Sequence, residues 1–594
     1  MIIRKISQRT ITEIDQGLAS FPLKIQHILS SRNIRSADEL NYQLRDLLAP
    51  SGLKDIQSAT SHLFKAIESH QSILIVGDFD ADGATSSAVM IKALNMLGAT
   101  KVNFLVPDRF KFGYGLSVKL VEHAASLKPD LIVTVDNGIA NIDGVAKANE
   151  LGIKVIITDH HLPAEELPAA ISIVNPNQPK DNFESKNLAG VGVAFYFMLS
   201  LRALMRNNGW FIDNNIEEPN LAILLDIVAL GTVADVVILD KNNRILVEQG
   251  LKRIRSGLAC PGIKALLKIA KRDETKCQAS DLGFAIGPRV NAAGRLDDMS
   301  IGIECLLAEN TEQATMIASK LDSLNRSRRN IEQEMLLQAN VDISAYLEKS
   351  LEDEGLSDSN SDSRPTSLCL FDPEWHQGVI GILASRVKDK INRPVIVFAK
   401  GDESTNENGG IVNNIKGSCR SVKGVHIRDV LALVDSQYPH LIEKFGGHAM
   451  AAGLSIEQND FERFASAFHD AVEAHLNGEV ISDEVITDGS LSSQELGINF
   501  ALEIRKFGPW GQGFLEPMFD DLFTVVTSRI VGENHLKLVV EKEGVNVDGI
   551  FFRCPEVLQA SPGDKVHLVY KLDINEFRGK ETAQLMIEQL EIIT

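Results

Sequence analysis

Three short apolar runs, each followed by acidic residues, place the strongest constraint on how this chain can fold. The runs are 73–76 (ILIV), 131–135 (LIVTV) and 154–158 (KVIIT), and helical patterns separate them. Short apolar strands that alternate with helices predict a doubly wound parallel sheet. In such a sheet, ligands bind outside the carboxyl ends of the strands. We therefore expect the residues that follow these runs to meet at one edge.

Carboxylates and imidazoles follow all three runs: Asp78, Asp80 and Asp82, then Asp136, then Asp159, His160 and His161. Taken alone, the first cluster is explained equally well by a solvated acidic turn and by a cation site. Hard divalent cations prefer carboxylate oxygens, and manganese also accepts imidazole. Three strands that bring such groups to one edge favour the cation site. Asp235 follows another apolar run and could reach this edge, although alone it is better explained as a helix N-cap.

Composition limits the class of protein. The chain has 594 residues, which predicts three or four domains at about 150 residues each. Its net charge of −20 argues against a uniformly basic nucleic-acid coat but not against a local basic groove. Six cysteines without a CxxC pair fit a reducing, cytoplasmic setting. The apolar run 221–239 contains Asp226 and Asp235, so we expect a buried helix and a turn rather than a membrane span.

The patterns along the chain divide it into several parts with different expected architectures. The α/β pattern that contains the acidic clusters is followed by a long charged helix, a polar acidic linker and a smaller α/β domain. The final pattern of short alternating strands predicts a small antiparallel barrel of OB type, a common platform for single-stranded nucleic acid. The expected parts are a helical extension (1–70), the first α/β domain (71–310), the connecting helix (311–350), the linker (351–366), the second α/β domain (367–478) and the barrel (485–594).

Four glycine-containing segments carry basic or hydroxyl side chains suited to phosphate: 107–115 (PDRFKFGYG), 287–295 (GPRVNAAGR), 416–421 (KGSCRS) and 445–453 (FGGHAMAAG). We interpret 107–115, 287–295 and 445–453 as irregular or loop segments. Each of the four segments alone is explained at least as well by an ordinary loop or turn, which at 416–421 would be a tight turn. They supply the candidate substrate-binding residues Arg109, Tyr114, Arg289, Asn291, Arg295, Ser418, Arg420 and His448.

Together these motifs resemble a known family. DFDADG, VDNGI and TDHH resemble the first motifs of the DHH phosphoesterase superfamily, and WHQGVIGILASR, KGSCRS and FGGHAMAAG resemble its DHHA1 companion domain. The loop PDRFKFGYG, the stretch PRVNAAGR, FGPWGQGFLEP before the barrel and NEFRG within it resemble the RecJ family of bacterial single-strand-specific 5′ exonucleases. The resemblance extends from about residue 50 to the C-terminus.

This resemblance implies two divalent cations, Mn²⁺ or Mg²⁺, held by two sets of ligands. The first set would be Asp78, Asp80 and Asp136, and the second Asp82, Asp136, His160 and Asp235, with Asp136 shared. His161 would contact the scissile phosphate. The implied catalytic residues are therefore Asp80, Asp82, Asp136, His160 and His161.

The same resemblance implies a reaction and its partners. Two-metal hydrolysis would release 5′-mononucleotides from single-stranded DNA, in DNA repair and recombination. Arg289, Ser418 and Arg420 would hold the terminal 5′-phosphate, and Phe112 and Tyr114 would stack bases. A helicase and a single-strand-binding protein are the expected partners of a monomer. The alternatives are a phosphodiesterase of short oligonucleotides or cyclic dinucleotides, and an inactive DNA-binding replication scaffold.

Overall fold

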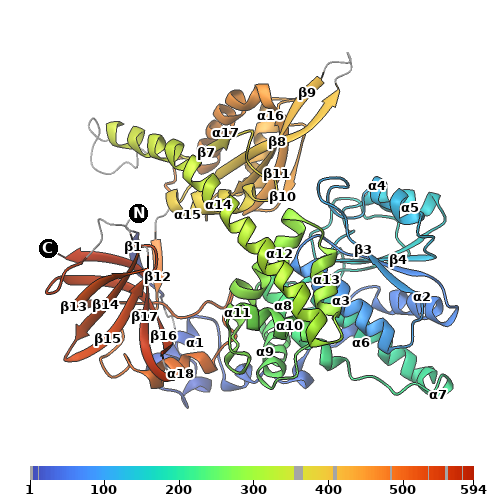
Figure 1. The fold of residues 1–594 in the computed structure, drawn as a ribbon, viewed down its shortest axis with the longest axis horizontal. Coiled ribbons are helices and arrows are strands. Elements are labelled where there is room, and N and C mark those ends of the chain that lie inside the picture. The colour runs from blue at the N-terminus through green and yellow to red at the C-terminus, as the bar shows by residue number, and fades with distance from the viewer. Residues whose placement is uncertain are drawn as a thin grey trace.

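A computed structural model describes residues 4–10, 13–353, 365–405, 411–481, 484–532, 534–554, 560–577 and 579–593. Three bodies surround the long helix α14 (Thr311–Asp353), which runs from the first α/β domain to the second (Figure 1). The connecting helix expected at 311–350 is thus present. Of the expected acidic linker, residues 351–353 belong to α14, and 354–364 lie outside the described residues.

The first α/β domain contains the predicted parallel sheet. All of its strands run in the same direction, in the order β3 (Val102–Leu105), β2 (Ile73–Val76), β4 (Leu131–Val135), β5 (Lys154–Thr158) and β6 (Ser172–Val174). Helices α4 (Val118–Ala125) and α5 (Ile142–Glu150) cover one face. The other face packs on α2 (Ile56–Glu68), α3 (Ala81–Met96) and α6 (Gly190–Asn207). Because both faces are covered, β2, β4 and β6 consist entirely of buried residues.

A helical layer follows the sheet, and it corrects one prediction. Its helices are α8 (Leu225–Ala234), α9 (Lys241–Arg255), α10 (Pro261–Ile269), α12 (Gly287–Leu296) and α13 (Ser300–Leu307). The segment 287–295, expected to be irregular, is helix α12, which continues the π-helix η7 (Leu282–Ile286). Proline is tolerated in the first turn of a helix, where Pro288 lies. Within the described residues, no helix is long and apolar enough to cross a membrane.

The second α/β domain has a mixed sheet with the strand order β10 (Lys444–Gly447), β11 (Ala451–Glu457), β9 (Ile411–Arg420), β8 (Val395–Thr405) and β7 (Leu368–Phe371). Helix α15 (Ile380–Ile391) packs on one side, and α16 (Ile427–Gln437) and α17 (Phe461–Leu476) pack on the other. One loop prediction, for 445–453, and the alternative of a tight turn at 416–421 are wrong here. Residues 416–420 end strand β9, and 445–453 form the β10–β11 hairpin with His448 in its turn.

The C-terminal part is the expected OB-type barrel, preceded by helix α18 (Ile498–Lys506). It is closed, and one of its strand pairs, 545–551 with 580–593, is parallel rather than antiparallel as expected. The barrel order is β13 (Phe519–Val531), β14 (His535–Lys542), β15 (Val545–Phe551), β17 (Lys580–Ile593) and β16 (Lys565–Phe577). Strands β13 and β16 also pair, which closes the barrel and removes its free edges. Its core of phenylalanine, leucine and valine side chains is continuous with the core of the first domain.

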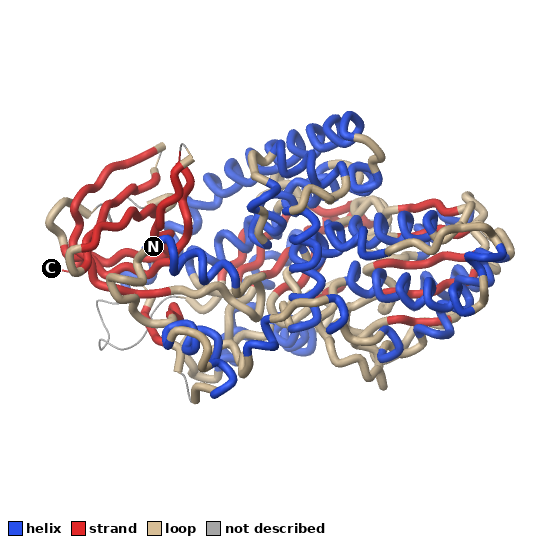
Figure 2. Tube along the Cα trace, turned by 90° about the horizontal axis from the view of Figure 1, so that it is seen from below, coloured by secondary structure: helices blue, strands red, loops and turns tan. Residues whose placement is uncertain are grey.

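The N-terminal region, expected to be helical, also contains a strand. Strand β1 (Lys5–Gln8) pairs in parallel with β12 (Glu484–Thr487), next to the barrel. The seam is strengthened by Arg32, whose Nη1 and Nη2 donate to the carboxylate of Asp488 at 2.8 and 3.0 Å. Both views place β1 on the barrel side of the molecule (Figures 1 and 2). The sequence around β1 has no strong strand pattern, because its pairing depends on residues far along the chain.

Candidate active site

The acidic turn after β2 is tightly folded. Asp80 is the N-cap of α3, and its Oδ1 accepts hydrogen bonds from the N–H groups of Asp82 and Gly83 at 2.9 and 3.0 Å. A Cβ at Gly83 would lie 2.4 Å from the carbonyl oxygen of Asp78, so the turn requires glycine there. The geometry of the DFDADG motif therefore directs its carboxylates to the end of the sheet rather than into solvent.

Asp82 is buried and held by a second helix. Its two carboxylate oxygens accept the N–H groups of Gly190 and Val191 at 2.6 and 2.9 Å, at the N-terminus of α6. An N-terminus stabilises negative charge because its N–H groups are free and its dipole is positive. A Cβ at Gly190 would lie 2.6 Å from the Cβ of Asp136, so this glycine allows α6 to approach both carboxylates.

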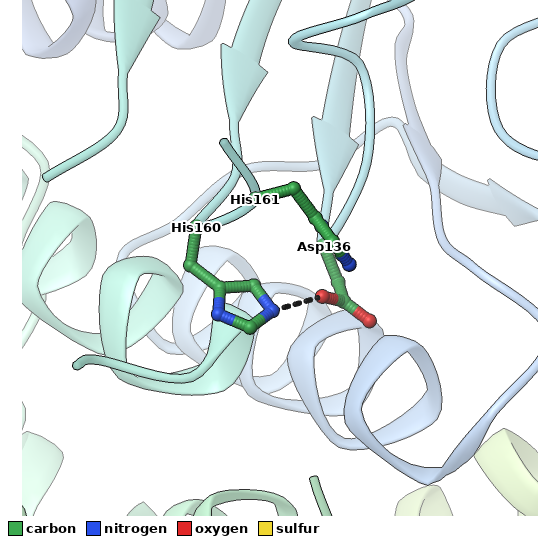
Figure 3. A group of neighbouring side chains, drawn as sticks. All are labelled: Asp136, His160 and His161. Atoms are coloured by element: carbon green, nitrogen blue, oxygen red, sulfur yellow. Dashed lines mark ion pairs between the residues drawn. The ribbon is translucent and has the colours of Figure 1, made fainter. Parts of the chain in front are cut away.

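His160 lies close to carboxylates from three elements, and Figure 3 shows its contact with Asp136. Its Nε2 lies 3.2 Å from Oδ1 of Asp136, 3.5 Å from Oδ2 of Asp235 and 3.9 Å from Oδ2 of Asp82. Asp136 follows β4 with φ of 63°, a left-handed conformation that is uncommon for a residue other than glycine. Asp235 is the C-cap of α8 and not an N-cap. The structure thus brings together all of the sequence-predicted metal-site residues.

Burial and mutual repulsion make this cluster electrostatically unfavourable without a cation. Burial, followed by repulsion from Asp80, raises the pKa of Asp78 well above its usual value and that of Asp82 to about 7. Burial and repulsion from Asp82 likewise raise the pKa values of Asp136 and Asp235. Burial lowers the pKa of His160 to about 3, so that its imidazole is neutral and able to ligate a metal.

The donor atoms fall into groups of the size that a metal ion needs. Asp78, Asp80 and Asp136 form one group and Asp82, His160 and Asp235 another, and the donor atoms within each lie within 4.8 Å of one another. A third group combines Asp136 with His160 and His161. Among the described residues, Asp78 Oδ1, Asp136 Oδ1 and His160 Nε2 are buried without a hydrogen-bond partner. Oxygen donors, one imidazole and such unsatisfied atoms fit Mn²⁺ or Mg²⁺.

Asp159 is a functional candidate that sequence reasoning did not select. Its Oδ1 lies 2.7 Å from Nδ1 of His161, and its Oδ2 accepts the N–H group of Ile139 at 2.9 Å. The carboxylate offsets the burial of the imidazole and raises the pKa of His161 to about 9. The first residue of the DHH motif therefore orients the third. The position of Asp159 directly after β5 was the sequence signal for a role at the site. Its adjacency to both histidines did not show which of them it contacts.

Three arginines meet beside the acidic cluster. Arg109 lies over the ring of Phe79, with Cζ 4.1 Å from the ring centroid, and Arg295 donates to the carbonyl oxygen of Gly378 at 3.0 Å. Burial and repulsion from Arg109 and Arg420 lower the pKa of Arg295 to about 10. Arg420 donates to Oγ of Ser418 at 3.2 Å. A negatively charged group bound next to these arginines would be stabilised. The three arginines are therefore a candidate phosphate site.

Two of the predicted phosphate ligands have other partners. Arg289 donates through Nε and Nη2 to Oδ1 of Asp322 on α14, at 2.9 Å each. It therefore connects α12 to α14. Arg295, rather than Arg289, is the arginine of this motif that lies near Arg420. Asn291 accepts the N–H group of Ala81 at 2.8 Å and so supports the turn that holds Asp80.

Aromatic and imidazole rings extend from the acidic cluster toward the second domain. The hydroxyl of Tyr114 lies 3.3 Å from Nε2 of His161, and the ring of His448 lies nearly parallel to His161 at a centroid distance of 6.3 Å. Tyr114 is 44% exposed and accessible to a ligand. Phe112, expected to stack bases, instead packs on His123 inside the first domain. The two domains thus face each other across His161 and His448.

Comparison with known proteins finds three family models along the chain. The model of the DHH family, N-terminal domain, matches residues 72–232, the DHHA1 domain matches 366–474, and the RecJ OB domain matches 487–589. The single-stranded-DNA-specific exonuclease RecJ of Escherichia coli (strain K12) is 48% identical over 99% of both chains. The chain belongs to the RecJ family.

Solved structures of RecJ relatives support the fold and the choice of cation. RecJ of Thermus thermophilus, solved in complex with Mn²⁺, has a TM-score of 0.77 and 26% identity, and the match covers 99% of this chain and 79% of that one. The same protein with Mg²⁺ has a TM-score of 0.70 and 25% identity, with coverage of 99% and 78%. RecJ proteins thus combine this fold with the two cations that the donor atoms described above would accept.

Proposed function

We propose that this chain is a single-stranded-DNA-specific exonuclease that hydrolyses the strand from its 5′ end and releases 5′-mononucleotides. The observation that carries the proposal is the position of Arg109 and Arg295 close to Asp80, with Arg420 close to Arg295. Burial, followed by repulsion from Arg109 and Arg420, lowers the pKa of Arg295, and attraction to Asp80 opposes this lowering. A terminal phosphate held by the arginines would place the next phosphodiester at the carboxylates, and this would set the polarity of digestion.

The proposed ligands are Asp78, Asp80 and Asp136 for one cation and Asp82, Asp136, His160 and Asp235 for the other. When bound, the two cations would activate water and neutralise charge on the phosphate that is attacked. Asp82 is fixed by the N-terminus of α6 and Asp80 by its own helix, so the ligands are held in place before substrate arrives. This arrangement avoids much of the reorganisation cost of binding.

His161 is proposed to contact the scissile phosphate. Asp159 accepts the proton on Nδ1, which leaves Nε2, beside the hydroxyl of Tyr114, to face the ligand. Ser418 and Arg420 come from the second domain, whereas Arg109 and Arg295 come from the first. Substrate must therefore be bound by both domains at once, which favours a flexible single strand over a rigid duplex.

The barrel is proposed to bind the strand beyond the site, and the family resemblance supports four further proposals. These are a role in DNA repair and recombination, a cytoplasmic location, action as a monomer, and cooperation with a helicase and a single-strand-binding protein. Deleting residues from about 485 onward should weaken binding of long strands more than it slows the hydrolysis of short ones.

The proposed function is tested by digesting 5′- and 3′-labelled single and double strands with added Mn²⁺. We expect label to be released as mononucleotide from the 5′ end of single strands alone. The Asp80→Ala variant is the matched control, and it should be inactive while remaining folded by circular dichroism. Preferential cleavage of dinucleotides or cyclic dinucleotides would favour the short-substrate phosphodiesterase. Binding without any cleavage would favour the DNA-binding scaffold.

A further inference from the structure

An exposed phenylalanine lies on a π-helical turn near the proposed active site. Phe284, in η7, is 81% exposed. Exposing a phenylalanine to water forgoes the free energy of burying its ring, and π-helical turns occur frequently at functional sites. Nothing in the proposed chemistry uses this ring, and its neighbours Ala285 and Ile286 are buried in the core.

The accessible face of the helix that begins at η7 leads from this ring to the proposed phosphate site. Phe284, Pro288, Asn291 and Arg295 are spaced by four, three and four residues, so they follow one face. Arg295 stands in the arginine group, and Asn291 contacts the turn that holds Asp80. Phe284 lies beyond them, about 16 Å from Arg295 along the axis at about 1.5 Å per residue.

The turn that contains Asp235 lies against the same segment. A Cβ at Gly283 would be 3.2 Å from Cγ1 of Val233, and a Cβ at Gly287 would be 3.2 Å from Cβ of Ala234. The residue after Asp235 is Val236, which is 64% exposed and has φ of 62°. A β-branched residue in this region is a conformational outlier, and such strain concentrates at functional sites.

The segment after Val236 connects the site to the barrel. The N–H group of Leu239 donates to the carbonyl oxygen of Gln512 at 2.8 Å, and a Cβ at Gly513 would lie 2.6 Å from Ile238. Residues 512 and 513 belong to the segment between α18 and the barrel. Gly283 and Gly287, on either side of Phe284, thus pack on the end of α8, and the chain continues from there through Asp235 to the residues that contact the segment before the barrel.

We propose that Phe284 stacks against a base on the 3′ side of the scissile bond. This inference rests on the proposed function, because the 5′ end must lie at the arginine group for the rest of the strand to pass Phe284. An aromatic ring stacks on every base and makes no hydrogen bond, so the contact would add affinity without sequence preference. Phe284 is thus a substrate-positioning residue rather than a catalytic one.

The test compares Phe284→Ala with the ring-preserving Phe284→Tyr, with strand length as the second variable. We expect Phe284→Ala to raise KM for a long single strand about tenfold, the effect of losing one stacked base. Hydrolysis of a dinucleotide, which ends before Phe284, should be unchanged, and Phe284→Tyr should restore KM. Ile212→Ala is the matched control, because Ile212 is 86% exposed on α7 (Trp210–Asp213), remote from the barrel in Figure 1.

A set of strands that each carry one abasic position gives an independent measurement. We expect one position to weaken binding to the wild-type protein but not to Phe284→Ala, because the stacking contact is then already lost. If Phe284→Ala matches Ile212→Ala while the wild-type protein degrades strands, the stacking contact is refuted and the proposed function stands. If Phe284→Ala slows the hydrolysis of a dinucleotide as much as that of a long strand, Phe284 has a structural role and the inference fails. If the wild-type protein cleaves no strand, the proposed function fails, and this inference fails with it.

Discussion

The Oδ1 atom of Asp159 lies 2.7 Å from Nδ1 of His161, and the same carboxylate group also accepts the N–H group of Ile139. The first and third residues of the motif Asp159-His160-His161 therefore form one unit, while His160 turns toward Asp136. A buried carboxylate that orients an imidazole in this way fixes the direction of the ring.

Asp159→Asn tests this orienting role. We expect the rate of strand hydrolysis to fall by about 10- to 100-fold, as is typical when the partner of a site histidine is lost. Binding of Mn²⁺, measured by calorimetry, should persist because Asp159 belongs to neither proposed ligand set. Glu150→Gln, at an exposed position on α5, is the control. Wild-type activity in Asp159→Asn would contradict the role.

Removal of Asp136 tests the shared ligand. Mn²⁺ should raise the melting temperature of the wild-type protein, because the cation binds only the folded cluster and offsets the repulsion between its carboxylates. At a Mn²⁺ concentration 100 times the dissociation constant, the stabilisation is about 2.7 kcal/mol. In Asp136→Ala we expect the Mn²⁺-induced shift and the nuclease activity to be lost together. Substantial Mn²⁺-dependent activity in this variant would refute the two-metal assignment.

Arg295 and Arg289 should have different roles although they lie in one motif. Arg295→Gln should reduce the preference for 5′-phosphorylated over 5′-hydroxyl strands by about 10-fold or more, the effect of losing a charged hydrogen bond. Arg289→Gln should lower thermal stability, because it leaves Asp322 without one of its partners, and should leave the preference unchanged. Competition between a labelled 5′-phosphorylated strand and a labelled 5′-hydroxyl strand measures this preference in each variant. Equal loss of preference in both variants would contradict the assignment.

Arg32 should stabilise the seam between the N-terminal region and the barrel. The side chains of Arg32 and Asp488 are 2% and 3% exposed, so Arg32→Ala leaves a buried carboxylate with fewer partners. We expect a loss of about 3 kcal/mol in the free energy of unfolding, measured by urea denaturation, and faster proteolysis near β12. Arg45→Ala, which removes a 75%-exposed side chain, should change neither quantity. Unchanged stability in Arg32→Ala would show that the seam does not depend on this pair.

The buried Asp226 predicts a pH dependence outside the site. Burial raises the pKa of Asp226, so the folded protein binds its proton more tightly than the unfolded chain. Ionisation of Asp226 therefore costs stability as the pH rises from about 4 through its folded pKa. Asp226→Asn should raise the melting temperature relative to wild type more at pH 8 than at pH 4. An equal difference at both pH values would contradict this.

The sequence predicted the parallel sheet and the meeting of its acidic ends because those signals are local. A buried strand such as β4 is a continuous apolar run, and the position of Asp136 after it follows from strand direction. The barrel was also predictable from short alternating strands. The resemblance then supplied the ligand sets and the choice of Arg289 for the phosphate, but two arginines in one motif can be distinguished only by their partners. Asp322, which holds Arg289, lies on another helix.

Other features depended on contacts that sequence periodicity does not encode. Gly287 and Pro288 indicated an irregular segment, but in the structure η7 continues into helix α12. Packing requires a glycine in this helix, because a Cβ at Gly294 would lie 1.8 Å from the carbonyl oxygen of Phe79. The glycines at 446 and 447 indicated a loop, but cross-strand pairing with β11 holds them in β10.

The pairing of β1 with β12 also imposes an order on synthesis. Lys5 leaves the ribosome long before Glu484, its partner in the sheet, exists. At about 5–20 residues per second, the wait is roughly 25–100 seconds. During that time the N-terminal strand presents an unpaired edge, the kind of surface that invites pairing with another chain. The strand's shortness and its lysine limit that hazard, and the joining of the two segments becomes one of the last events of biogenesis.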